Sequence, residues 1–166
     1  LKRLDEARRQ GAVVRESATD VMAAYGSGPQ PWRSSAGSAL DEIVALQRRR
    51  ELEPLPPGVD HAVLDRSPVC TLALARHMGY DVPPGLAAEL DRIATEQPYE
   101  RQVLYVAWLG FLTPTDIRRI DEADTLRFDR IHRETYLELG YELVEVPVLP
   151  VEERVALVES LIGQAR

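Results

Sequence analysis

An acidic and a basic residue stand together at the end of a short apolar segment. Asp65 and Arg66 follow three apolar residues, 62–64, and the Ser67-Pro68 pair behind them is typical of a helix start. This order predicts a short buried strand, a charged pair at its carboxyl end, and a capped helix. Ligands of open α/β sheets bind outside the carboxyl ends of strands, so Asp65 could hold a metal ion and Arg66 a phosphate. The alternative, that Asp65 caps the helix and pairs with Arg66, has equal weight.

A second carboxylate occupies a comparable place earlier in the chain. Residues 12–16 are predicted to form a short parallel strand, and Glu16 falls at its carboxyl end. Glu16 could therefore face the same crevice as Asp65. The alternative is a loop carboxylate that pairs with a nearby arginine.

Two further stretches could contact a ligand. The turn-rich segment 26–37 contains Trp32 and Arg33, which could stack on a flat ligand in a lid or could anchor a surface loop. A strong helix is predicted over residues 38–52, and it contains Gln47 and the basic run 48–50. That run is expected to form a solvated helix face, with contact to phosphate as the alternative.

The remaining reactive side chains do not form a pattern with known chemistry. Cys70 is the only cysteine and falls on an apolar helix face, which predicts a buried, inert thiol and no internal disulfide. The simplest compartment is therefore reducing, hence cytoplasmic. His61, His77 and His132 lack metal-ligand spacing and are expected to be exposed or to cap helices.

Composition bounds the class of protein. The chain has 166 residues, of which 45% are hydrophobic and 28% charged, so we expect one domain with a substantial core. The net charge of -7 argues against a nucleic-acid partner, and no apolar run is long enough to span a membrane.

Strand and helix patterns alternate along the whole chain. This alternation predicts an α/β protein with three layers, in which helices cover both faces of a parallel sheet. Residues 1–10 look like the end of a helix. Besides the segments above, strands are predicted at 102–108 and 141–147, and helices at 17–25, 68–78, 86–96, 116–140 and 151–162.

Four segments, in this order, resemble the AAA-like ATPase domains of the P-loop NTPases, a group related to ribosylnicotinamide kinase domains and more distantly to nucleotide kinases. The first two are Val14-Arg15-Glu16-Ser17-Ala18, similar to the family's Pro-Glu-Ala-Ala-Arg, and Ala62-Val63-Leu64-Asp65-Arg66-Ser67, similar to its Phe-Asp-Arg-Gly. The third is Ile117-Arg118-Arg119, and the fourth and most specific is the ending from Arg133 to Pro147.

The resemblance implies ATP or GTP with Mg²⁺ as cofactors and a nucleotide and a small molecule as partners. By this likeness Asp65 would hold Mg²⁺ through water or orient the attacking group, and Arg66 would neutralise phosphate oxygens. Glu16, together with Trp32, Arg33 and Gln47, would lie on the substrate side. Arg118 and Arg119 would be lid arginines of the catalytic machinery, and the turn at Val146-Pro147 would flank the nucleotide base with backbone.

The phosphate-binding motif G-x-x-x-x-G-K-[ST] is not found in residues 1–166. The resemblance implies that residues 1–166 form one P-loop NTPase-like domain without its first strand and phosphate loop, which would lie upstream of Leu1. The function implied is that of a P-loop ATPase or small-molecule kinase. A non-catalytic nucleotide- or phosphate-binding scaffold and a structural interaction domain are the alternatives.

Overall fold

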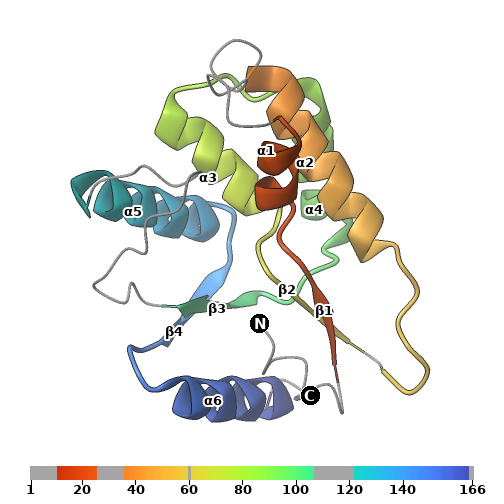
Figure 1. Ribbon diagram of the computed structural model, residues 1–166, viewed down its shortest axis with the longest axis vertical. Coiled ribbons are helices and arrows are strands. Elements are labelled where there is room, and N and C mark those ends of the chain that lie inside the picture. Colours follow the sequence, from red (N-terminus) through yellow and green to blue (C-terminus); the bar gives the residue numbers. More distant parts are fainter. Residues whose placement is uncertain (1–10, 26–35, 60, 107–121, 165–166) are drawn as a thin grey trace.

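The computed structural model describes residues 11–25, 36–59, 61–106 and 122–164 (Figure 1). Its elements alternate as predicted, and their bounds are β1 (Ala12–Val14), α1 (Ala18–Ala24), α2 (Ala36–Glu51), β2 (Ala62–Leu64), α3 (Pro68–Met78), α4 (Pro84–Glu96), β3 (Gln102–Val106), α5 (Glu122–Glu138), β4 (Glu142–Val146) and α6 (Val151–Gln164). The predicted helix end at 1–10, most of the loop at 26–37 and the start of the helix at 116–140 lie outside the described residues.

Two helices begin earlier than their sequence patterns predicted. Helix α2 starts at Ala36, so the last two residues of the expected loop already belong to a helix. Helix α4 starts at Pro84, with Pro83 in extended conformation before it. Proline suits the first helical position because its missing N–H would have no partner there.

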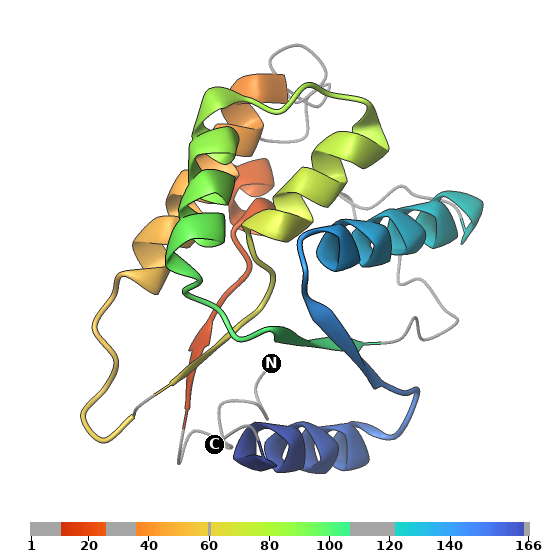
Figure 2. The same ribbon diagram turned by 180° about the vertical axis from the view of Figure 1, so that it is seen from behind.

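The strands form two parallel pairs. Strand β1 pairs with β2 in the register Ala12↔Ala62 to Val14↔Leu64, and β3 pairs with β4 from Gln102↔Glu142 to Val106↔Val146. Figure 2 shows the two pairs as separate units of the fold. The α/β class with parallel strands is therefore confirmed, and the sheets are small.

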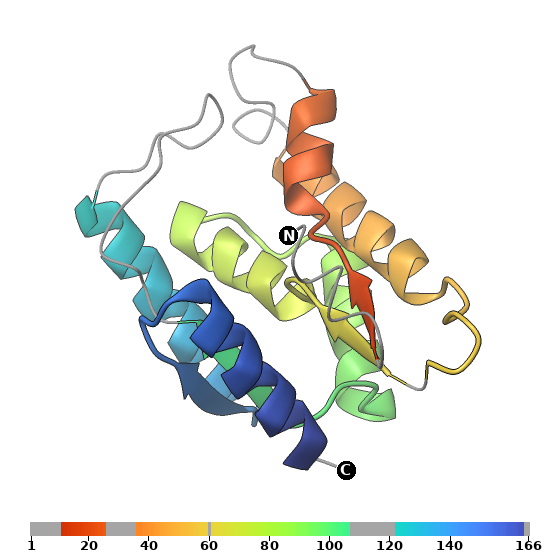
Figure 3. The ribbon, with the colours of Figure 1, turned by 60° about the horizontal axis from the view of Figure 1, so that its bottom comes forward.

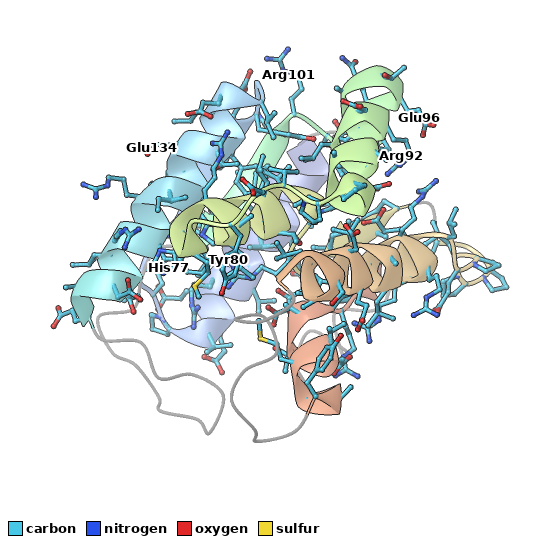
Figure 4. The ribbon with its side chains drawn as sticks, turned by 90° about the horizontal axis from the view of Figure 1, so that it is seen from above. His77, Tyr80, Arg92, Glu96, Arg101 and Glu134 are labelled. Carbon is cyan, nitrogen blue, oxygen red and sulfur yellow. The ribbon has the colours of Figure 1, made fainter. Side chains whose placement is uncertain are left out.

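The β2–α3 unit follows local signals in the sequence. The Ser67 hydroxyl accepts a hydrogen bond from the backbone N–H of Val69 at 3.2 Å and caps α3. Gly79 ends this helix in the left-handed conformation, with φ of 70°. Because α3 contacts α2, α4 and α5, its apolar residues form the centre of the core; Figure 4 shows it between α5 and α2.

A charged network joins the end of α2 to α4. The Tyr99 hydroxyl donates to the Glu51 carboxylate at 2.9 Å, and Arg92 binds Glu89 and Glu96 along α4. Figure 4 shows Arg92 and Glu96 side by side on this helix. Arg92 Nη2 also lies 3.9 Å from Glu51 Oε2, so the network links the end of α2 to α4.

Helix α6 lies on the other side of the strands from α1–α5, against β4 (Figures 1 and 3). In the portion of the chain described, no helix is both long and apolar enough to cross a membrane.

Candidate functional site

The parallel pairing of β1 and β2 brings the two predicted carboxylates together. The backbone N–H of Asp65 donates to the carbonyl of Val14 at 2.8 Å, which extends the ladder past the last paired residues. Two residues after Val14, the Oε1 atom of Glu16 lies 4.0 Å from the Nε atom of Arg66. Glu16, Asp65 and Arg66 therefore gather at one edge of the sheet, as their positions after the two strands predicted.

Arg66 has an unusual backbone conformation. Its φ of 77° lies in the left-handed region, which costs a residue with a Cβ atom free energy relative to glycine. The residue after it, Ser67, caps α3. Asp65 is thus not the side chain that caps this helix, and Arg66 forms its ion pair with Glu16. The strained arginine stands at the strand end where ligands of α/β folds bind.

The charge of Asp65 is only partly compensated. Partial desolvation raises the pKa of this carboxyl above its usual value, although the residue is exposed; Arg66 opposes the shift and Glu16 adds to it. A carboxylate in such surroundings is stabilised by an additional cation. The oxygen donors of Asp65 and Glu16 are of the type that Mg²⁺ prefers, and Arg66 is suited to phosphate oxygens.

Cys70 lies in the first turn of α3 within a polar cluster. Its sulfur is 3.1 Å from the Tyr136 hydroxyl, which in turn is 2.8 Å from the Ser67 hydroxyl. Burial alone would raise the pKa of the thiol, but a hydrogen bond from His132 and the charge of Arg66 lower it to about 6. The expectation of an inert thiol took no account of these partners from α5, distant in sequence, which favour the thiolate.

Two of the three histidines are buried, contrary to the expectation of exposed or capping side chains. His77 and His132 flank Phe128, with ring centroids 4.5 Å and 4.2 Å from the phenyl ring. The Nδ1 atom of His132 bonds to the Phe128 carbonyl at 3.0 Å and must carry a proton, since a carbonyl only accepts. The other ring nitrogen of His132 is then available to Cys70.

Gln47 and Arg50 face the turn between β1 and α1. The Gln47 side chain is buried, accepts a hydrogen bond from the Ser17 hydroxyl at 2.9 Å and donates to Glu51. Arg50 donates to the carbonyl of Glu16 at 2.5 Å. The expectation that residues 48–50 form only a solvated face is therefore wrong for Arg50, because α2 packs with this side against the turn.

The residues at the ends of β3 and β4 lie less closely around this edge, and among them Tyr105 was not singled out from the sequence. Tyr105 lies near the end of β3. Burial raises the pKa of its hydroxyl, and the nearby charge of Arg66 opposes that rise. Val146 ends β4 with a buried side chain, and Pro147 after it is exposed. Trp32, Arg33, Arg118 and Arg119 lie outside the described residues. No three His, Cys, Asp or Glu side chains of residues 11–25, 36–59, 61–106 and 122–164 cluster as a metal site.

An α/β fold with parallel strands and with acidic and basic side chains at strand ends is typical of proteins that bind a ligand at that end of the sheet. The family model described as AAA domain matches residues 1–154, so the chain belongs to the AAA domain family. No match was found among curated proteins or among solved structures. Membership of the family indicates a nucleotide-binding, P-loop ATPase-like function, and such domains generally bind their nucleotide with Mg²⁺.

Proposed function

We propose that this protein transfers the γ-phosphoryl group of ATP or GTP to a small metabolite or to water. The observation that carries the proposal is the convergence of Glu16, Asp65 and Arg66 at the carboxyl ends of β1 and β2. These residues supply both charges that phosphoryl transfer needs, in the part of the fold where ligands of α/β proteins bind.

Mg²⁺ bound with the nucleotide supplies positive charge to the phosphate oxygens. Asp65 would hold that ion through water or orient the attacking hydroxyl, and its partly uncompensated carboxylate favours a cation partner. Arg66 would stabilise the charge that develops on the transferred group, a role in which a planar guanidinium offers several donors. Glu16 would contact the acceptor, since it stands beside Arg66 on the neighbouring strand.

The family likeness assigns further residues, which complete the proposal. Arg118 and Arg119 would close over the phosphoryl group, and Trp32 and Arg33 would contact the substrate. The turn at Val146-Pro147 would flank the nucleotide base.

Gln47, proposed as a substrate-side residue, would act through the turn that contains Glu16, because Ser17 and Glu51 engage its amide.

We further propose that one strand from outside residues 1–166 joins the two strand pairs into a single sheet. Parallel sheets of α/β proteins are normally covered on both faces. Here the described strands form two separate parallel pairs, and Val106 at the end of β3 is 52% exposed. A strand between β2 and β3 would bury both inner edges, give the three-layer arrangement, and bring a Gly-rich phosphate loop to Asp65 and Arg66.

The substrates are proposed to be small molecules in the cytoplasm. The net charge of -7 disfavours nucleic acid as a partner.

The test is ADP formation from Mg·ATP by the full-length protein and by the Asp65→Asn variant. We expect turnover to fall by about 100-fold in this variant, as for loss of one group that acts on the transition state. Asp91→Asn, an exposed carboxylate on α4, is the matched control and should be silent. Equal turnover by Asp65→Asn would refute the role of Asp65. A wild-type protein that Mg·ATP stabilises without turnover would instead be a nucleotide-binding scaffold.

A further inference from the structure

The last turn of α2 contacts the turn between β1 and α1, which carries Glu16 of the site. Arg50 is next to last in this helix and its side chain is only 21% exposed. Its Nη1 atom donates to the carbonyls of Arg15 and Glu16, at 3.1 and 2.5 Å, and approaches the Ser17 hydroxyl at 3.4 Å. Its Nη2 atom forms an ion pair with Asp20 at the start of α1. One guanidinium therefore engages three successive residues of the β1–α1 turn and one side chain in the first turn of α1.

The hydrogen bonds from Arg50 take the place of β-ladder hydrogen bonds beyond the end of the β1–β2 pairing. The carbonyl of Val14 accepts from Asp65, but the next two carbonyls, of Arg15 and Glu16, lie past the end of the β1–β2 pairing. The bond to the Arg15 carbonyl is exposed, whereas the one to the Glu16 carbonyl is partly buried, and a buried polar backbone group needs a partner. Arg50 donates to both carbonyls, and Gln47, one helical turn earlier on α2, holds Ser17 from the same side.

The Glu16 side chain leaves the turn toward the site. Its Oε1 atom lies 4.0 Å from Arg66 Nε, and its Oε2 atom accepts from the Thr19 hydroxyl at 2.9 Å. The backbone of Glu16 is thus bonded to α2 while its carboxylate faces the strained arginine of the neighbouring strand. A shift of this turn would change the separation of Glu16 and Arg66.

We propose that Arg50 is a positioning residue that sets the placement of the Glu16 carboxylate relative to Arg66. This inference rests on the proposed function for its effect on turnover. Lysine could keep the ion pair with Asp20, but its single ammonium lacks the planar fork that spans both carbonyls and the carboxylate. Arg49 is the matched comparison, because it precedes Arg50 in the same basic run and its side chain is exposed.

The experiment compares Arg50→Lys with Arg49→Lys in the full-length protein labelled with ¹⁵N-arginine. The Nε–H signal of Arg66, identified by its loss in Arg66→Ala, reports the distance to Glu16 without any substrate. We expect this signal to move in Arg50→Lys and to stay in place in Arg49→Lys. An unmoved signal in Arg50→Lys, with the protein folded by circular dichroism, would overturn the proposal whatever the turnover.

Turnover of Mg·ATP is the second readout, since small displacements of a catalytic group cost rate. We expect Arg50→Lys to lower kcat by about 10- to 100-fold and Arg49→Lys to leave it unchanged. In a Glu16→Gln background the further loss caused by Arg50→Lys should disappear, whereas a merely structural effect would persist. If the wild type neither binds nor turns over Mg·ATP, the proposed function fails, while the response of the Arg66 signal still decides the positioning role.

Discussion

Replacing Arg66 with glycine should separate the stability of the fold from the function of the site. The φ of 77° at this position is unfavourable for arginine and natural for glycine. Gln97, with φ of 48° at the end of α4, is the matched control, because its left-handed backbone lies at a helix terminus away from Glu16 and Asp65. The same change at the two positions should therefore give similar folds and different activities.

The expected magnitude follows from three terms. Relief of the left-handed backbone stabilises the fold by about 1 kcal/mol, and the greater freedom of glycine in the unfolded chain costs about 0.5–1 kcal/mol. The ion pair to Glu16 joins a side chain that is 47% exposed across 4.0 Å, so its loss costs only a few tenths, about 0.3 kcal/mol. The free energy of unfolding of Arg66→Gly should thus stay within about 1 kcal/mol of the wild type.

Urea unfolding and Mg·ATP turnover, measured on the same samples, provide the assay. Gln97→Gly should keep full turnover and unfold at the same or slightly higher urea concentration. Arg66→Gly should lose about 100-fold in turnover, as expected when a group that stabilises developing charge is removed. Arg66→Ala keeps the strained backbone but avoids the greater freedom of glycine in the unfolded chain, so its free energy of unfolding should lie within about 0.5 kcal/mol of that of Arg66→Gly.

Two results would refute this reasoning. A loss of about 3 kcal/mol or more in Arg66→Gly, a size typical of buried core residues, would show that Arg66 holds the fold together. Full turnover by Arg66→Gly would show that the guanidinium has no part in the chemistry.

Two further predictions concern the thiol of Cys70 and the approach of α2 to α4. The pH profile of Cys70 alkylation by iodoacetamide should have its midpoint near pH 6, because the lowered pKa of the thiol gives thiolate there. The His132→Gln variant should have a higher midpoint. A wild-type midpoint at about 8.5, the value of an unperturbed thiol, would show that the neighbours of Cys70 do not lower its pKa. A Cβ atom at Gly85 would lie 2.7 Å from Asp41 Oδ1, which accepts from the N–H of Leu86, so Gly85→Ala should destabilise by about 1 kcal/mol in urea unfolding. In an Asp41→Ala background the same change should become stabilising, because alanine is the better helix former, and an unchanged sign would refute the steric account.

The β2–α3 unit shows what could be predicted from the sequence. Apolar residues, Asp65-Arg66, Ser67-Pro68 and Gly79 are all local signals, and each has its structural counterpart within a few residues. Strand pairing in parallel then brings Glu16 to the same edge, a step that follows from general rules of α/β folds.

Interactions between distant segments could not be predicted from one sequence. The bonds of Arg50 to the β1–α1 turn and to α1 cross 30 or more positions, and the contact of Cys70 with Tyr136 crosses 66. A basic run and a lone cysteine have the same local pattern whether they are solvated, buried or engaged. Only the packing of α2 and α5 decides between these states.

The separation of the strands into two pairs has a consequence for local unfolding. Within the part of the chain that the structure describes, the amides of β1–β2 and those of β3–β4 have no ladder in common, so without the joining strand proposed above each pair can open by its own fluctuation. Hydrogen exchange should therefore reveal two groups of amides with different opening free energies, coupled mainly by the packing of α3 on α5. A ligand bound across both pairs would join these openings into one event, and the slowest-exchanging amides would then span the whole strand layer.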